Sequence, residues 1–239
     1  VKDGDTVVRG GFSLEPADFR LFTLMARQAG SRLYDPKTNL PEIADAAGIR
    51  TLQYFADIMP YSILYNPAPG AQTLRSFQTS ESAMAYITTE EISAMIANDP
   101  SLKDEIGICS YVPADDGEDS TWCGFRLFSI NAASKDKDAA WDVISYLMTE
   151  EANRNRMENA NVAPAYKSLN EEYKLLNEKV NVPASESIAV GVPFPKTDWM
   201  TSYGEAVRNA QQEVLYGEKS VEEALNDAEN LIKTDAQLN

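Results

Sequence analysis

Acidic side chains are the groups in this sequence with the clearest capacity for chemistry. The chain of 239 residues has 37 Asp and Glu residues and no histidine. The lack of histidine excludes Ser-His-Asp and Cys-His triads and any zinc site built on imidazole. A pair of carboxylates can hydrolyse a glycosidic bond, and Glu90 with Asp115 or Asp116 offers such a pair. Nothing in their spacing distinguishes an acid from a nucleophile, so a glycoside hydrolase is one hypothesis among several.

Cysteines and short motifs point to no further reaction. The sequence contains no Walker loop, no G-x-G-x-x-G and no G-x-S-x-G, and we expect no cofactor. Cys109 and Cys123 are too few for a metal site, so we expect no metal either. The two cysteines lie in neighbouring predicted strands. An oxidising compartment permits a disulfide between them, and two buried free thiols are the alternative.

The charge balance narrows the class of partner. The formal net charge is −16 at pH 7, which argues against binding to nucleic acid or to an anionic membrane surface. A solvated acidic surface that keeps a secreted protein soluble is the simplest explanation, and a cationic ligand is another. No apolar run is long enough to cross a membrane. The start lacks a signal-like segment, so we expect any targeting segment to lie outside this sequence.

Hydrophobic patterning predicts strands that alternate with helices. Residues 125–130 form a short apolar run typical of a buried strand. The segment 140–148 carries apolar residues at helical spacing, Trp141 is expected to pack within that helix, and Thr149 is suited to cap a second one. This alternation is typical of an α/β chain with a helical end. Further predictions are strands over 84–87, 106–112 and 121–130, an extended segment over 182–194, and two C-terminal helices whose inward stripes are Tyr203, Ala206, Val207, Ala210 and Val214, then Val221, Ala224, Leu225, Ala228, Leu231 and Ile232.

The order of these parts resembles one protein family. Within residues 125–161 the chain has a strand ending in S-I-N-A-A-S, a helix with A-W-D-V-I-S-Y-L and a helix opening on T-E-E-A, and the loop V-A-P-A-Y-K-S follows. This order is similar to that of the extracellular solute-binding proteins of ABC importers, in the branch that includes the maltose-binding protein. The phrase S-A-M-A-Y-I over residues 82–87, the step Leu14-Glu15-Pro16 and the ending S-V-E-E-A-L also resemble family patterns.

The resemblance implies a fold and a domain organisation. Family members have two α/β lobes joined by crossing strands, and nothing here corresponds to the family's first lobe. The implied fold is therefore the C-terminal lobe of a type II periplasmic-binding-protein-like α/β structure, with crossing strands and C-terminal helices. We expect the second lobe over 1–123, a crossing strand and helices returning toward the missing N-terminal lobe over 124–185, and C-terminal helices packing back on the second lobe over 186–239.

The resemblance also implies a function without catalysis. Such a protein captures a sugar or oligosaccharide between its lobes and delivers it to an ABC permease in the membrane. Its location would be extracytoplasmic, either periplasmic or lipid-anchored at the cell surface. One alternative is a receptor for a polyamine or other cation that uses Glu15, Glu90 and Glu91. A structural or adhesion module is another.

Candidate ligand-binding residues follow from the matched positions, each with a structural alternative. Glu15 falls on the family's Glu-Pro step, but could be an acid at a helix N-terminus. The turn over residues 88–90 matches a sugar-facing turn, yet it lacks the family's tryptophan and could be a plain helix start. Gly204 takes the place of another family aromatic. The full set is Glu15, Thr88, Thr89, Glu90, Trp122, Gly124, Trp199 and Tyr203, in which the tryptophans and the tyrosine could equally be core residues.

Overall fold

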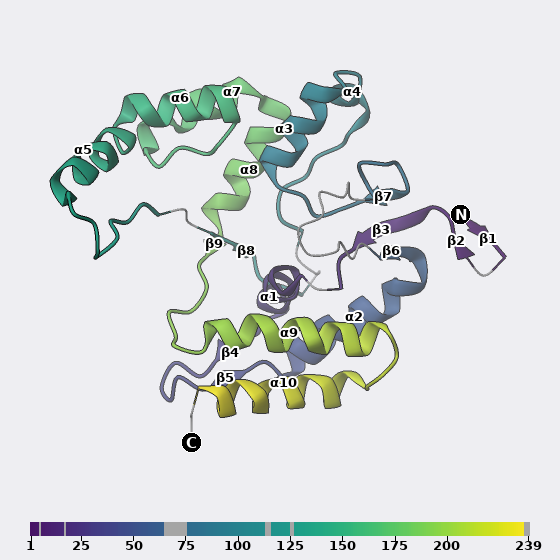
Figure 1. Ribbon diagram of the computed structural model, residues 1–239. Coiled ribbons are helices and arrows are strands. Elements are labelled where there is room, and N and C mark those ends of the chain that lie inside the picture. Colours follow the sequence, from purple (N-terminus) through teal and green to yellow (C-terminus); the bar gives the residue numbers. More distant parts are fainter. Residues whose placement is uncertain (5, 17, 65–75, 113–115, 125–126, 237–239) are drawn as a thin grey trace. The chain divides into compact units, whose positions relative to one another are not determined.

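The computed structural model divides the chain into two compact units (Figure 1). It describes residues 1–4, 6–16, 18–64, 76–112, 116–124 and 127–236. Unit 1 comprises Val1–Tyr86, Val112–Trp122 and Val192–Asn239, and unit 2 comprises Ile87–Tyr111 and Cys123–Gly191. Helices and a parallel sheet occur together, which confirms the predicted α/β class. The expected boundaries after residues 123 and 185 stay a prediction.

A three-stranded parallel sheet lies within unit 1. Its central strand β3 (Gly10–Leu14) pairs with β6 (Ser62–Leu64) on one side and β7 (Ser82–Met84) on the other. Gly10 permits the close approach to β6, because a Cβ atom there would lie 2.8 Å from the backbone nitrogen of Ile63. The short strands of this unit are β1 (Lys2–Asp3) paired with β2 (Thr6–Val7), β4 (Leu33–Tyr34) paired with β5 (Pro41–Glu42), and β8 (Thr121–Trp122).

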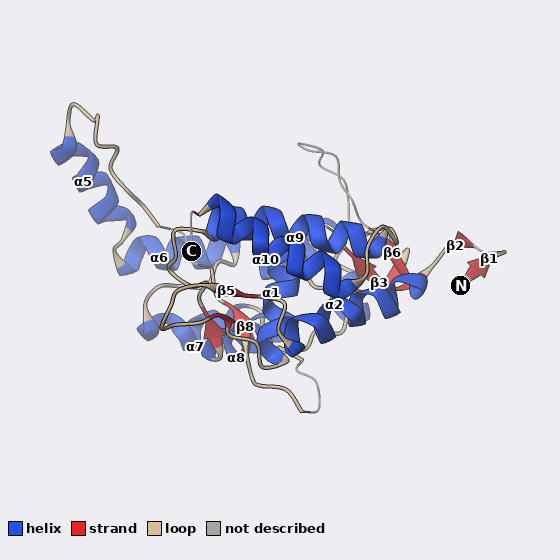
Figure 2. Cartoon of the chain, turned by 90° about the horizontal axis from the view of Figure 1, so that it is seen from below, coloured by secondary structure: helices blue, strands red, loops and turns tan. Residues whose placement is uncertain are grey.

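Four long helices build the core of unit 1. They are α1 (Phe19–Gln28), α2 (Ala46–Ile58), α9 (Met200–Leu215) and α10 (Val221–Asp235), and the 3-10 turn η1 (Met59–Tyr61) follows α2. Side-chain oxygens of Asp18, Asp45 and Ser220 cap α1, α2 and α10. Helices α9 and α10 lie side by side (Figures 1 and 2). Both predicted C-terminal stripes are confirmed as buried core except at Leu231, which is exposed.

The described part of unit 2 is mainly helical. Its helices are α3 (Thr89–Asn98), α4 (Leu102–Glu105), α5 (Lys137–Leu147), α6 (Glu150–Ala160), η2 (Lys167–Leu169), α7 (Asn170–Leu176) and α8 (Glu178–Ala189). The strand β9 (Gly191–Val192) begins at Gly191, the last residue of unit 2. Thr149 caps α6 as predicted.

Two asparagine amides, buried Asn181 and half-buried Asn161, connect four helices of unit 2. The side chains of Asn161 and Asn181 donate to each other at 2.9 and 2.8 Å. Asn161 also donates to the hydroxyl of Ser93 on α3, and Asn181 donates to the backbone oxygen of Tyr173 on α7. Asn161 ends α6 in the left-handed conformation (φ 49°) that asparagine tolerates. Because these groups satisfy one another's hydrogen bonds, they help to fix how α3, α6, α7 and α8 meet.

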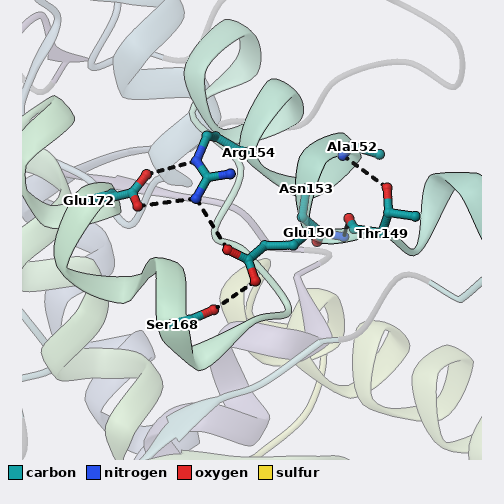
Figure 3. A network of polar contacts seen from close by, with 7 residues as sticks. All are labelled: Thr149, Glu150, Ala152, Asn153, Arg154, Ser168 and Glu172. Atoms are coloured by element: carbon teal, nitrogen blue, oxygen red, sulfur yellow. Dashed lines mark hydrogen bonds and ion pairs between the residues drawn. The ribbon is translucent and has the colours of Figure 1, made fainter.

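An ion-pair network joins α6 to α7 (Figure 3). The Arg154 guanidinium donates to both oxygens of Glu172, at 2.9 and 3.2 Å, and to Glu150 at 3.2 Å. The Ser168 hydroxyl donates to the second oxygen of Glu150 at 3.4 Å. The hydrogen bond from Arg154 holds the pKa of Glu172 below its ordinary value. This forked geometry is the strongest that arginine offers a carboxylate.

Several sequence predictions fail in this structure. Residues 127–130 and 106–112 are described and form no strand. Leu127 is 87 % exposed, and an apolar run becomes a strand only where another strand accepts its backbone hydrogen bonds. The predicted extended segment over 182–194 is helical as far as Ala189, with Pro183 inside α8. Burial of Val180 and Asn181 supports this helix despite the proline.

The two cysteines and Trp141 also differ from what the sequence predicted. Both cysteines are free thiols, with Cys109 exposed and Cys123 half-buried, so neither a disulfide nor a pair of buried thiols is present. Trp141, expected to pack within its helix, is 61 % exposed.

We expect Glu172→Gln to alter stability in one pH range only. The depressed pKa of Glu172 makes its ion pair stabilising above the carboxyl group's ordinary value of 4.5, and that contribution is lost as the pH falls through the lowered value. Melting temperatures of the variant and the parent should therefore differ at neutral pH and converge in acid. A constant difference at all pH values would contradict this assignment.

Candidate functional site

The candidate residues fall into both units. Unit 1 holds Glu15, Trp122, Trp199 and Tyr203, and unit 2 holds the segment 88–90 together with Gly124.

Trp199 and Tyr203 lie in the core of unit 1. Each is 1 % exposed. The indole nitrogen of Trp199 donates to the backbone oxygen of Asn39 at 2.8 Å, and the Tyr203 hydroxyl shares a 2.6 Å hydrogen bond with the hydroxyl of Thr23. Burial raises the pKa of Tyr203 above its ordinary value. Neither ring offers a face to solvent in this structure, and a role in ligand contact stays a prediction.

Three other aromatic rings of unit 1 are partly accessible and lie close together. Phe19 and Phe194 stack with their ring centroids 5.7 Å apart, and the centroid of the Trp122 ring also lies 5.7 Å from that of Phe194. We call Phe19, Phe194 and Trp122 the aromatic row. Trp122 is 38 % exposed, and the other two rings are half-buried. The guanidinium of Arg208 lies over the Phe19 ring at 4.7 Å, within cation–π range.

Sequence reasoning named only Trp122 from this row. The signal for Phe19 was indirect, because the sequence places Gly204 where the family has an aromatic residue. A Cβ atom at Gly204 would lie 3.6 Å from the Phe19 ring, so Phe19 occupies the space beside this glycine. No local pattern pointed to Phe194, which reaches the row by tertiary packing.

A small hollow adjoins the aromatic row. Its space is about 230 Å³, counted out to the open mouth. Polar groups of α1 and β8 and apolar side chains share its lining, which comprises Thr23, Leu24, Arg27, Leu33, Ser120, Thr121, Trp122, Val192, Pro193, Phe194 and Pro195. All of these residues belong to unit 1.

Glu15 lies in the turn between β3 and α1. Its backbone oxygen accepts a hydrogen bond from the amide of Asp18 at 3.2 Å. Asp18, rather than Glu15, caps α1 by accepting from the amide of Arg20 at 3.0 Å. Glu15 is half-buried, and its contact with a ligand stays a prediction.

The candidate turn of unit 2 is a helix start. Thr88 caps α3 in a reciprocal box, since its hydroxyl accepts from the Glu91 amide at 3.2 Å and the Glu91 carboxylate accepts from the Thr88 amide at 3.0 Å. The Thr89 hydroxyl donates to Glu90 at 3.3 Å. Burial, together with the charge of Glu90, raises the pKa of the nearby Tyr173 hydroxyl. The structure thus brings Thr89 and Glu90 to Tyr173, which sequence reasoning did not identify.

The last candidates carry little chemistry in this arrangement. Gly124 is exposed and follows β8 outside any helix or strand. Asp115 lies outside the described residues. Asp116 is exposed and accepts two hydrogen bonds from Arg50, at 2.7 and 2.9 Å, which hold its pKa below the ordinary value. A general acid needs a raised pKa, so Asp116 fits an ion pair better than a catalytic acid.

Neither a metal cluster nor a membrane span is evident in the described part of the chain. No group of three or more Cys, Asp or Glu side chains there could hold a metal ion. No helix within the described ranges has the length and apolar character needed to cross a bilayer.

Comparison with known proteins places the chain in a family. The model of the bacterial extracellular solute-binding proteins matches residues 2–184. A search of curated protein sequences finds no match.

Solved structures share the fold at low sequence identity. The GacH receptor of Streptomyces glaucescens, solved unliganded and with acarbose and an acarbose homolog, has a TM-score of 0.82 and 20% identity over 96% of this chain and 60% of its own. The sugar-binding protein MalE of Xanthomonas citri gives 0.80 and 15% over 97% and 59%. The maltose/maltodextrin-binding domain MalE of Bdellovibrio bacteriovorus, bound to maltotriose, gives 0.77 and 18% over 96% and 61%. The chain therefore spans about 60% of the length of these proteins.

We expect the two tryptophans of unit 1 to differ sharply in their effect on stability. Trp199→Ala removes a fully buried ring and should lower the free energy of unfolding by about 3–5 kcal/mol. Trp122→Ala removes a ring at the surface and should cost about 1 kcal/mol or less. Urea denaturation of both variants measures the difference. Equal losses would contradict the placement of Trp199 in the core.

Proposed function

Because this chain belongs to the bacterial extracellular solute-binding proteins, we propose that it forms one lobe of a receptor that captures a sugar or oligosaccharide for an ABC importer. The observation that supports a sugar most directly is the aromatic row of unit 1. Sugars present C–H faces that pack on aromatic rings, and their hydroxyl groups need hydrogen-bond partners at the ring's edge. The named ligands of two structural neighbours, acarbose and maltotriose, agree with this choice.

The charges beside the aromatic row favour a sugar over a polyamine. Arg208 lies over Phe19, and Arg27 lines the hollow beside Trp122, so two cations would repel a third. Glu91, one of the acids considered for a cation receptor, is engaged in the cap of α3.

The receptor would act by closure rather than by catalysis. Two lobes joined by a hinge would enclose the ligand and present it to a permease in the membrane. This role places the protein outside the cytoplasm, either in a periplasm or anchored by lipid at the cell surface. It requires no cofactor.

We also propose that the part of the receptor which this chain does not span covers the apolar surface around α5. No residue of α5 is buried, although the helix carries the apolar face predicted from the sequence. Trp141 and Val143 are 61 and 59 % exposed, and Tyr146 and Met148 are also exposed. The chain spans only about 60% of the length of its structural neighbours, and the remainder is long enough to supply a covering lobe. Apolar patches of this kind mark an interface.

The proposed covering predicts a context-dependent effect of Val143→Asp. In the 239-residue chain the variant should change stability by no more than about 0.5 kcal/mol, because the position is exposed there. In the full-length protein it should cost about 2 kcal/mol or more, because a charge would be buried at the interface. Leu231→Asp on α10, also exposed, serves as the control and should behave alike in both proteins. The same small effect of Val143→Asp in both would contradict the proposal.

A thermal-shift screen of the full-length protein tests the function itself. The panel contains neutral oligosaccharides and polyamines, and the 239-residue chain is tested in parallel. We expect a sugar to raise the melting temperature of the full-length protein, by an amount that grows with sugar concentration, and to leave the chain unchanged. A shift with polyamines alone, weakened by salt, would replace the sugar receptor with the cation receptor.

A further inference from the structure

The chain passes between its two units at four places, which follow Tyr86, Tyr111, Trp122 and Gly191. In a two-lobed receptor these passages have to accommodate any movement of one lobe against the other. A hinge consists of a few residues that absorb backbone rotation, and its place depends on where the segments beside it are held. The contacts that each passage makes within its own unit therefore show where the chain is free to bend.

Gln28, the last residue of α1, holds the passage that leaves unit 1 after Trp122. It is 3 % exposed. Its backbone oxygen accepts a hydrogen bond from the amide of Glu118 at 2.7 Å, and its side-chain amide donates to the backbone oxygen of Ser120 at 2.8 Å. Ser120 directly precedes β8. A buried carbonyl that loses its donor is costly, so the Gln28 side chain keeps this segment fastened to α1.

The passage that enters unit 1 at Val192 is held by the same helix. The Phe194 ring stacks on that of Phe19, the first residue of α1, with the centroids 5.7 Å apart. Residues 192–195 also share the lining of the hollow with Thr23 and Arg27 of α1. Helix α1 thus holds two passages within unit 1, one by hydrogen bonds and the other by packing.

In unit 2 the C-terminal end of α8 holds the passages. The amide of Tyr111 donates to the Ser187 hydroxyl at 3.1 Å, at the point where the chain leaves unit 2. Cys123, where the chain enters unit 2, lies against Gly191. A Cβ atom at Gly191 would lie 2.9 Å from the Cβ atom of Cys123 and 3.3 Å from its sulfur. Only glycine allows this close approach without displacing its neighbour.

Little of the chain remains unfastened between the contacts of the two units. Two residues separate Ser120 from Cys123. Two also separate Gly191 from Phe194, and one of them is Pro193, whose ring fixes φ. Rotation is therefore restricted to two short links.

We propose that α1 and the end of α8 confine lobe movement to these two links, and that Gln28 is a positioning residue which sets where the first link begins. The proposal rests on the proposed receptor function, because only a protein whose lobes close needs such links. Gln28 acts through the main chain of residues 118–120 and contacts no ligand in this role. Gly191 acts in unit 2 by admitting Cys123 to the end of α8.

The distance between the two units in the full-length protein tests this role. Nitroxide labels are attached to p-acetylphenylalanine introduced in place of Asn98 on α3 and Glu222 on α10, both exposed, so that the native cysteines stay unlabelled. Double electron–electron resonance without ligand then gives the distribution of distances. Gln28→Met keeps the side-chain length but removes the donor. It should broaden the distribution about 1.5- to 2-fold, because the spread of a free segment grows with the square root of its length.

A second variant acts on the other side of the links. Gly191→Ala places a methyl group where Cys123 lies. It should shift the most populated distance by about 2 Å, because a small displacement at a hinge is amplified in the parts that it joins. This variant decides the test if circular dichroism shows that Gln28→Met is unfolded.

Two controls separate positioning from a general loss of stability. Gln53→Met on α2 makes the same substitution at an exposed glutamine, whose side chain donates to Asp57 on its own helix. Leu169→Ala removes a fully buried side chain from the small core of unit 2 and lowers stability. Both controls should keep the distribution of the parent.

The outcomes separate this role from the receptor function. An unchanged width in folded Gln28→Met, or an unchanged distance in Gly191→Ala when that variant decides, would overturn the proposal. Equal broadening in Leu169→Ala would also overturn it, because loss of stability would then explain the effect. The labels report on the protein without ligand, so these results do not depend on sugar binding. A thermal-shift screen without any sugar response would remove the receptor function and leave the measured widths as they are.

Discussion

The packing of α1 against α9 is the contact on which unit 1 depends. Phe19, Thr23 and Arg27 follow one another at four-residue intervals and therefore share one face of α1. Phe19 meets the helix where Gly204 leaves space for its ring, and Thr23 shares a buried hydrogen bond with Tyr203. Arg27 then reaches the hollow beside Trp122. One helix face thus supplies part of the aromatic row, a core hydrogen bond and a cation that lines the hollow.

Unit 2 differs from unit 1 in where its polar and apolar side chains lie. Its interior relies on paired amide side chains, above all buried Asn181 with half-buried Asn161. Its surface carries large apolar side chains on α5 that no described residue of unit 2 covers. Polar groups inside and apolar groups outside are costly in an isolated domain. The amides meet that cost by complete pairing, whereas α5 would need another part of the protein, as a lobe of a two-lobed receptor would provide.

Buried and exposed aromatic residues have separate roles in the proposed receptor. Trp199 and Tyr203 hold α9 to its neighbours through hydrogen bonds as well as packing. Trp122 lies at the surface beside the hollow, and only such a ring can pack on a ligand without disturbing the core. Aromatic residues of the same type therefore differ in function according to how deeply they are buried. The faces of a buried ring are already covered by other side chains of the protein.

Local patterning by itself determined the helices with strong periodicity and clear caps. The stripe of α10 is buried at Val221 and Leu225, and Ser220 caps this helix. The family and the α/β class could also be predicted from the sequence, because both depend on the order of the elements along the chain. Tertiary structure decided the rest. It alone buried Trp199, brought Phe194 to Trp122 and left residues 127–130 without a partner strand. These outcomes depend on contacts between residues far apart in the chain, and local spacing contains no information about such contacts.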